Sequence, residues 1–179
     1  MRSAYEVHLE CYVRLLLHAP SRALLRAGQL PDAVDWLPML DQLEEFAQSL
    51  LDKRVGEFRR ALPRSLRFAP QLVSDYRSWL AENPAMETPS VLPPGLSEAL
   101  RARKALCSLP RASASTLAEL YHFEVYAQAS RIDGQIRFLS TEVPIHALYA
   151  QLAEGPLPQE PEGPPHRYRF AMDIQWKAR

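Results

Sequence analysis

The stretch ELYHFEVYAQASRIDGQIRFLS, residues 119–140, decides how the second half of the chain is interpreted. Apolar and polar side chains alternate over residues 121–128 and again over residues 136–138, with a break between the two runs. Two-residue periodicity is typical of β-strands. An Asp-Gly pair readily adopts the positive φ that a tight turn requires. The stretch therefore predicts a β-hairpin with Asp133 and Gly134 in its turn.

A third strand is predicted at the end of the chain, in HRYRFAMDIQWKAR, residues 166–179. Apolar and polar side chains alternate there from His166 to Trp176. Before it, VPIHALYAQLAEG predicts a helix that begins near Pro144 and ends at Gly155. The C-terminal third is therefore ββαβ, and a right-handed crossover gives the strand order 2-1-3. In that order residues 136–139 and 167–174 form the two open edges.

The first half of the chain is predicted to be helical, because its apolar residues recur at three- and four-residue steps. We expect a helix over residues 3–18, a short one that ends at Gly28, a long one that is broken at Pro38, and one or two more before Pro84. The fold class is α+β. The predicted organisation is a helical bundle over residues 1–83, a Pro-rich connector over 84–96, and a helix followed by the ββαβ unit over 97–179.

Composition excludes several functional classes. Lys plus Arg equals Asp plus Glu, 21 against 21, so the chain as a whole carries no electrostatic footprint for nucleic acid or an anionic membrane. The apolar run around Leu15 is too short to span a membrane. Cys11 and Cys107 are far apart and form no disulfide framework, which favours a cytoplasmic setting.

Motifs of known catalytic mechanics are absent from the sequence, including phosphate loops, nucleophile elbows and paired cysteines. His8 and Cys11 are three residues apart, but no second pair accompanies them to complete a metal site. His122 and Glu124 share a face of the predicted strand, and a solvated sheet face is the preferred interpretation. We therefore predict no catalytic residue, no metal ligand and no cofactor on this chain.

The densest charge feature is KRVGEFRRALPRSLRF, residues 53–68. One interpretation is intramolecular balance against the acidic stretch DQLEEF on a neighbouring helix. The other is a partner-binding surface, because the rigid fork of arginine suits carboxylates. The second interpretation assigns partner binding to Arg54, Arg59, Arg60 and Arg64.

The small sheet gives a candidate peptide-binding site. An open edge can accept an extended peptide as an extra strand, and contacts with alternate side chains of the peptide then give selectivity. Alternatively, the cations along these strands only protect the edges against pairing. The first interpretation assigns peptide binding, with preference for the last strand, to Arg167, Tyr168, Arg169, Phe170, Arg137 and Phe138.

The layout of the chain resembles one known family. A helical region that contains RFAPQLVSDYRSWLAENP, residues 67–84, a Pro-rich connector and a terminal ββαβ unit are similar to the C proteins of methanobactin biosynthesis, the MbnC family. The resemblance covers most of the chain as architecture and includes no catalytic signature. No binding residue of the family can be placed on particular positions here.

The resemblance implies a non-catalytic subunit of a heteromeric oxidase. The iron would lie on a TIM-barrel partner subunit, MbnB, and this chain would bind the leader of a ribosomal precursor peptide, MbnA. The complex would convert cysteines of that peptide to oxazolone and thioamide groups of a copper chelator. Two other classes remain open: a protein–protein adaptor without an enzymatic partner, and a stand-alone enzyme with a site that no motif reveals.

Overall fold

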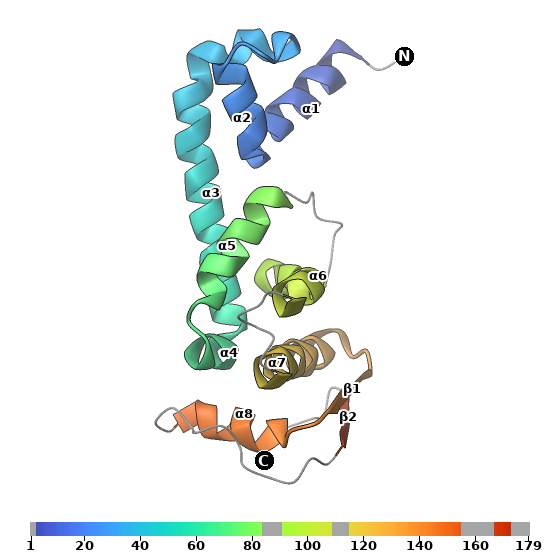
Figure 1. The fold of residues 1–179 in the computed structure, drawn as a ribbon. Coiled ribbons are helices and arrows are strands. Elements are labelled where there is room, and N and C mark those ends of the chain that lie inside the picture. Colours follow the sequence, from blue (N-terminus) through green and yellow to red (C-terminus); the bar gives the residue numbers. More distant parts are fainter. Residues whose placement is uncertain (1–2, 84–90, 109–114, 155–166, 173–179) are drawn as a thin grey trace. The chain divides into compact units, whose positions relative to one another are not determined.

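The computed structural model describes residues 3–83, 91–108, 115–154 and 167–172. These residues are mostly helical and include a small antiparallel sheet near the C-terminus, in agreement with the predicted α+β class (Figure 1). The elements are α1 (Ala4–Leu17), α2 (Ala19–Arg26), η1 (Pro31–Met39), α3 (Leu40–Ala61), α4 (Pro63–Phe68), α5 (Leu72–Glu82), α6 (Pro94–Ser108), α7 (Ser115–Asp133), β1 (Arg137–Thr141), α8 (Ile145–Glu154) and β2 (Tyr168–Met172).

The chain packs into two compact units. Unit 1 is Met1–Lys53 with Leu80–Met86, and unit 2 is Arg54–Trp79 with Glu87–Arg179. These limits differ from the predicted regions 1–83, 84–96 and 97–179, because residues 54–79 pack with the later part of the chain. Helix α6 also begins inside the predicted connector, at Pro94.

Unit 1 has its own apolar core, formed by α1, α2, η1 and the first part of α3. Helix α1 begins with a capping box, in which the Glu6 N–H donates to Ser3 Oγ and the Ser3 N–H donates to Glu6 Oε2. The predicted helix over residues 3–18 is therefore confirmed. The core side chains are Leu15, Leu25, Ala33, Leu40 and Leu43.

The predicted break at Pro38 is also confirmed. Pro38 lies in the 3₁₀ helix η1, and the α-helical hydrogen bonding of α3 begins two residues later. Proline has no N–H to donate and disturbs the interior of an α-helix, so the regular helix starts beyond it. Although α3 has 22 residues, neither it nor any other described helix is both long and apolar enough to cross a membrane.

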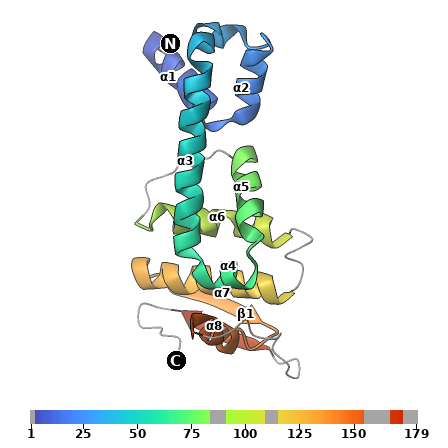
Figure 2. The same ribbon diagram turned by 90° about the vertical axis from the view of Figure 1, so that its left-hand side faces the viewer.

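Helix α7 is the centre of unit 2. It contacts α4, α6, α8 and both strands, and Figures 1 and 2 show it between α6 on one side and α8 with the sheet on the other. Its buried side chains join those of α8 and β2 in one apolar cluster, so the sheet is fixed to the helical part of unit 2. The cluster consists of Leu120, Phe123, Ala127, Ile145, Leu148, Tyr149, Leu152 and Met172.

The prediction of a first strand over residues 121–128 is wrong, because these residues belong to α7. A helix that is covered on nearly every side needs apolar residues all round, so the 3.6-residue period disappears from its sequence. Glu124, which we expected on a solvated strand face, is fully buried. Gly134 has the expected positive φ of 71°, but it follows the last turn of α7 instead of forming a hairpin.

The described sheet has two strands, and the predicted 2-1-3 order is wrong for it. Strand β1 pairs directly with β2 in antiparallel orientation, with Leu139 opposite Phe170 and Thr141 opposite Tyr168. Because the predicted first strand is helical, the last strand takes the place beside β1. The predicted helix between the two strands is confirmed as α8. The part of the predicted last strand beyond Met172 lies outside the described residues.

Glu124 ties α7 to α4. Its carboxylate accepts hydrogen bonds from the backbone N–H groups of Arg64 and Ser65, at 3.1 and 2.7 Å, in the first turn of α4. No residue before α4 supplies a side-chain cap, so Glu124 satisfies two donors that would otherwise be unpaired. Burial raises the pKa of the Glu124 carboxyl, and the hydrogen bonds from Ser65 and Arg64 oppose this rise without cancelling it.

This shift predicts a pH dependence of stability. Since the folded state holds a proton on Glu124 more readily than the unfolded chain does, the stabilisation is complete below the unfolded pKa near 4.5 and is lost as pH rises through the folded value. We expect the free energy of unfolding of the wild type, relative to that of Glu124→Gln, to fall as the pH is raised from 4.5. Urea unfolding at several pH values measures this. The prediction would be contradicted if this difference in the free energy of unfolding stayed constant, or increased, as the pH is raised.

Candidate functional site

The two strands have one face on the helices and one face in solvent. Along both strands, half-buried or buried residues alternate with exposed ones. In the antiparallel register, residues that are opposite each other on the two strands lie on the same face of the sheet. Leu139 and Phe170 face inward, while Phe138 and Ala171 face outward. The alternation that predicted the last strand is therefore confirmed over residues 168–172, with Tyr168 and Phe170 on one side and Arg169 on the other.

Two of the three aromatic residues that we assigned to peptide binding, Tyr168 and Phe170, lie on the inner face of the sheet. The Phe170 ring meets the Phe123 ring edge to face, with 5.1 Å between the centroids, and Tyr168 lies 6.0 Å from the ring of His146. Both rings pack on the helices, so neither lies on the outer face of the sheet. Their aromatic area contributes to holding the sheet in place.

The outer face carries the other candidates. Phe138 is 75% exposed, which is unusual for a large apolar side chain on a strand. Arg169 is exposed opposite Ser140, and Arg167 is exposed just before β2 begins. A large apolar side chain beside cations, on a strand with backbone donors and acceptors, is chemistry that suits an acidic or amphipathic peptide.

Arg137 is directed inward and is already engaged. Its two terminal nitrogens donate to the two carboxylate oxygens of Asp133, at 2.8 and 2.6 Å, and one of them also donates to Ser130 Oγ. The hydrogen bonds from Arg137 hold the pKa of the Asp133 carboxyl below its usual range. The pair fixes the end of α7 to the start of β1 and engages both terminal nitrogens of Arg137.

Two of the four arginines assigned to partner binding are also engaged within unit 2. Arg54 Nε donates to Glu98 Oε1 at 2.7 Å, and Arg54 Nη2 lies 2.5 Å from the same oxygen but outside hydrogen-bond geometry. The guanidinium of Arg64 lies 3.8 Å from the centre of the Tyr149 ring and donates to the Tyr149 carbonyl at 3.0 Å. These two contacts join Arg64 in α4 to α8.

Arg59 and Arg60 differ from these two. Both are exposed near the end of α3, and within the described parts of the chain no carboxylate pairs with either. The basic segment is therefore divided by the fold: Arg54 and Arg64 stabilise unit 2, while Arg59 and Arg60 remain available to a partner. The acidic stretch DQLEEF pairs instead with Arg26, which donates to Asp41 and Glu44.

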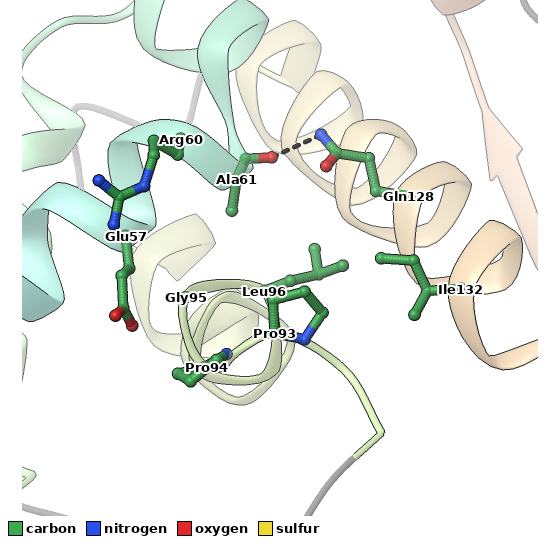
Figure 3. A pocket seen from close by; sticks show the side chains of 9 residues that line it. All are labelled: Glu57, Arg60, Ala61, Pro93, Pro94, Gly95, Leu96, Gln128 and Ile132. Carbon is green, nitrogen blue, oxygen red and sulfur yellow. Dashed lines mark hydrogen bonds between the residues drawn. The ribbon is translucent and has the colours of Figure 1, made fainter.

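A pocket of about 350 Å³ opens beside Arg60, and the sequence did not predict it (Figure 3). It lies in unit 2, where the end of α3, the start of α6 and the last turns of α7 meet. The side chain of Gln128 donates to the carbonyl of Ala61 across it. The lining residues are Glu57, Arg60, Ala61, Pro93, Pro94, Gly95, Leu96, Gln128 and Ile132.

Gly95 makes this junction possible. A Cβ at Gly95 would lie 2.5 Å from the backbone carbon and oxygen of Glu57, so only glycine lets α6 approach α3 so closely. The signal in the sequence was Pro93-Pro94-Gly95, which we interpreted as connector. It is instead the first turn of a helix, where proline is well tolerated.

The remaining ionisable candidates are used in packing. His8, which we considered with Cys11, lies with its ring 4.5 Å from the ring of Trp36. Burial, assisted by Arg103, lowers the pKa of His122. Among the residues that the structure describes, no three His, Cys, Asp or Glu side chains are grouped as a metal ion would require.

Comparison of the chain with protein-family models, with curated proteins and with solved structures finds no match.

Proposed function

We propose that this chain is a non-catalytic subunit that binds a ribosomal precursor peptide for an iron-dependent TIM-barrel oxidase, as in the MbnC family that its layout resembles. The pair would act in the cytoplasm and present cysteines of the peptide for conversion to oxazolone and thioamide groups. Iron and dioxygen chemistry would belong to the partner. The contribution of this chain would be to bind and orient the peptide.

The observation that carries the proposal is the small C-terminal sheet. Its inner face is packed on α7 and α8, so the backbone of β1 and β2 is held in place before any ligand arrives. Its outer face presents exposed Phe138 and Arg169. A pre-organised strand costs little conformational entropy on binding, and an extended peptide can pair with it through main-chain hydrogen bonds.

Unit 1 supports a protein partner. Among its described residues, eight large apolar side chains are exposed, and exposed apolar surface can bind a protein partner. They are Tyr5, Val7, Leu9, Leu24, Val34, Leu37, Met39 and Phe46.

The exposed side chains of η1 are arranged in rows. Because a 3₁₀ helix has three residues per turn, Val34 and Leu37 lie in one exposed row, and exposed Asp32 and Asp35 lie in the next. An apolar row beside an acidic row suits a partner surface that combines apolar and cationic groups. This surface of unit 1 is where we expect the oxidase to bind.

Proline substitutions on the two strands test peptide binding. Arg169→Pro and Ala171→Pro each remove one backbone donor from β2, and Ser140→Pro is the matched change on β1. We expect at least one of these variants to bind a fluorescently labelled precursor peptide about tenfold more weakly, on the order of 1.4 kcal/mol, in an anisotropy titration.

The control is the circular-dichroism melt of each variant, since proline can also unfold a strand. Only variants that keep the wild-type transition are compared. If all correctly folded variants bind the peptide as tightly as the wild type, the backbone N–H groups of Ser140, Arg169 and Ala171 do not pair with the peptide.

A further inference from the structure

We propose that the pocket between α3, α6 and α7 anchors an apolar side chain of an acidic peptide, and that Arg60 at its rim binds a carboxylate of the same peptide. This inference rests on the proposed function as a peptide-binding subunit. It adds a second binding element, away from the paired strands, and it defines the chemistry of the peptide that fits.

The residues that line the pocket are held in place by contacts within unit 2 before any peptide binds. Gly95 brings the first turn of α6 against the backbone of Glu57, Leu96 is buried beneath it, and the Gln128 side chain is hydrogen-bonded to Ala61 (Figure 3). Proline rings restrict the backbone on a further wall. Since none of these groups must become ordered on binding, the pocket can accept a side chain at little entropic cost. Its volume of about 350 Å³ lies at the lower end of the range of ligand sites.

One exposed large apolar side chain of unit 2 lines this pocket, and the others lie near its lining residues or on β1 in the sequence. Ile132 is 47% exposed and lines it, and Val91 lies two residues before the lining residue Pro93. Ile136 and Phe138 continue from Ile132 into β1, because α7 leads directly into that strand. These four are all the exposed large apolar side chains in the described part of unit 2.

Charge selects an acidic occupant. Unit 2 contains 16 Lys and Arg against 12 Asp and Glu, whereas unit 1 is acidic. Arg54, Arg64 and Arg137 are held by partners within unit 2, but Arg60, which lines the pocket, is exposed. Glu57 on the same wall can accept a backbone N–H of the peptide. Arginine can bind a carboxylate with two parallel hydrogen bonds, which suits Glu or Asp beside the anchoring residue.

A synthetic peptide tests the pocket without the oxidase. The probe is a short labelled peptide in which Leu and Glu alternate, titrated with the full chain at low ionic strength and followed by fluorescence anisotropy. Two comparison peptides replace every Glu with Lys or every Leu with Ser. We expect the Leu–Glu peptide to bind about tenfold more tightly than either. Equal binding of all three, or no binding of the Leu–Glu peptide, would overturn the proposal.

Variants of exposed residues locate the binding. Ile132→Ser and Arg60→Glu should each weaken the Leu–Glu peptide about tenfold. The matched controls are Leu24→Ser, at 41% exposure in unit 1, and Lys104→Glu, which makes the same change of net charge at an exposed residue of α6 outside the pocket lining. The controls should change affinity much less. If Ile132→Ser and Arg60→Glu bind like their controls, the pocket is not the site.

The outcomes also separate this inference from the proposed function. If the pocket variants lose affinity for the peptide, the pocket is a peptide-binding site, whether or not an oxidase binds the chain. Normal affinity in the pocket variants, combined with loss in the strand variants, overturns the pocket and leaves the peptide-binding function intact.

Discussion

Replacing Glu98 with Ala is expected to lower the free energy of unfolding by about 3–5 kcal/mol, which is typical of breaking a buried ion pair from one side. Glu98 is 4% exposed and accepts hydrogen bonds from Arg54 and from the hydroxyl of Tyr76. Burial raises the pKa of Tyr76 well above its usual value, so the phenol remains a donor. Without the carboxylate, the half-buried guanidinium and the buried hydroxyl would both lose their partner. Urea unfolding measures the change.

A double variant is the control for this effect. Arg54→Met combined with Glu98→Leu removes both charges and replaces them with apolar side chains of similar size. Such replacements are often neutral or stabilising, so the double variant should recover the part of the loss that comes from the unpaired guanidinium, while the Tyr76 hydroxyl still lacks its partner. The ring of Phe58 stacks on the ring of Tyr76 with 3.8 Å between their centroids, and this packing should be kept in the double variant. A loss of less than about 1 kcal/mol for Glu98→Ala would mean that the cluster contributes little to the fold.

Gly95→Ala is expected to destabilise unit 2 by about 1–3 kcal/mol, because the new methyl group overlaps the backbone of Glu57 and forces α6 away from α3. Gly56→Ala is the matched control. Gly56 lies within α3, and a Cβ there would meet nothing within 4 Å. Alanine is the better helix former, so this change should stabilise the chain by about 0.5–1 kcal/mol.

Thermal and urea unfolding of the two glycine variants should therefore shift in opposite directions. Gly95→Ala should also weaken the Leu–Glu peptide if the protein remains folded, since Gly95 lines the pocket. Shifts of the same sign and size in both variants would contradict the close approach of α6 and α3.

The sequence predicted most helices of the first half because these helices have one face in solvent. Helix α1, the break at Pro38 and helix α8 were found from apolar spacing and proline positions alone. Helix α7 was not predicted, because it is buried on most sides. Its apolar and polar residues alternate by coincidence in two-residue steps, as in a strand. Glu124 also favoured the wrong prediction of a strand, because a charged residue in an alternating run usually lies on a face exposed to solvent. Here its carboxylate is buried and accepts hydrogen bonds from the first turn of α4.

The candidate site was predicted in part. The alternation over residues 168–172 correctly separated inner from outer side chains, but it could not tell which set faces the helices. Consequently the aromatic pair Tyr168 and Phe170 was assigned to the ligand although it packs on the core. The pocket could not be predicted at all, since it depends on the meeting of three helices that are distant in sequence.

Hydrogen exchange of the full chain, with and without the precursor peptide, would show which backbone amides the peptide protects. We expect the peptide to slow exchange of backbone amides in β1 or β2, with further protection near Ile132 at the pocket. Amides of α1 and α2 should exchange at the same rate in both samples. Protection confined to unit 1, or no protection anywhere at saturating peptide, would contradict the claim that unit 2 is a peptide-binding module.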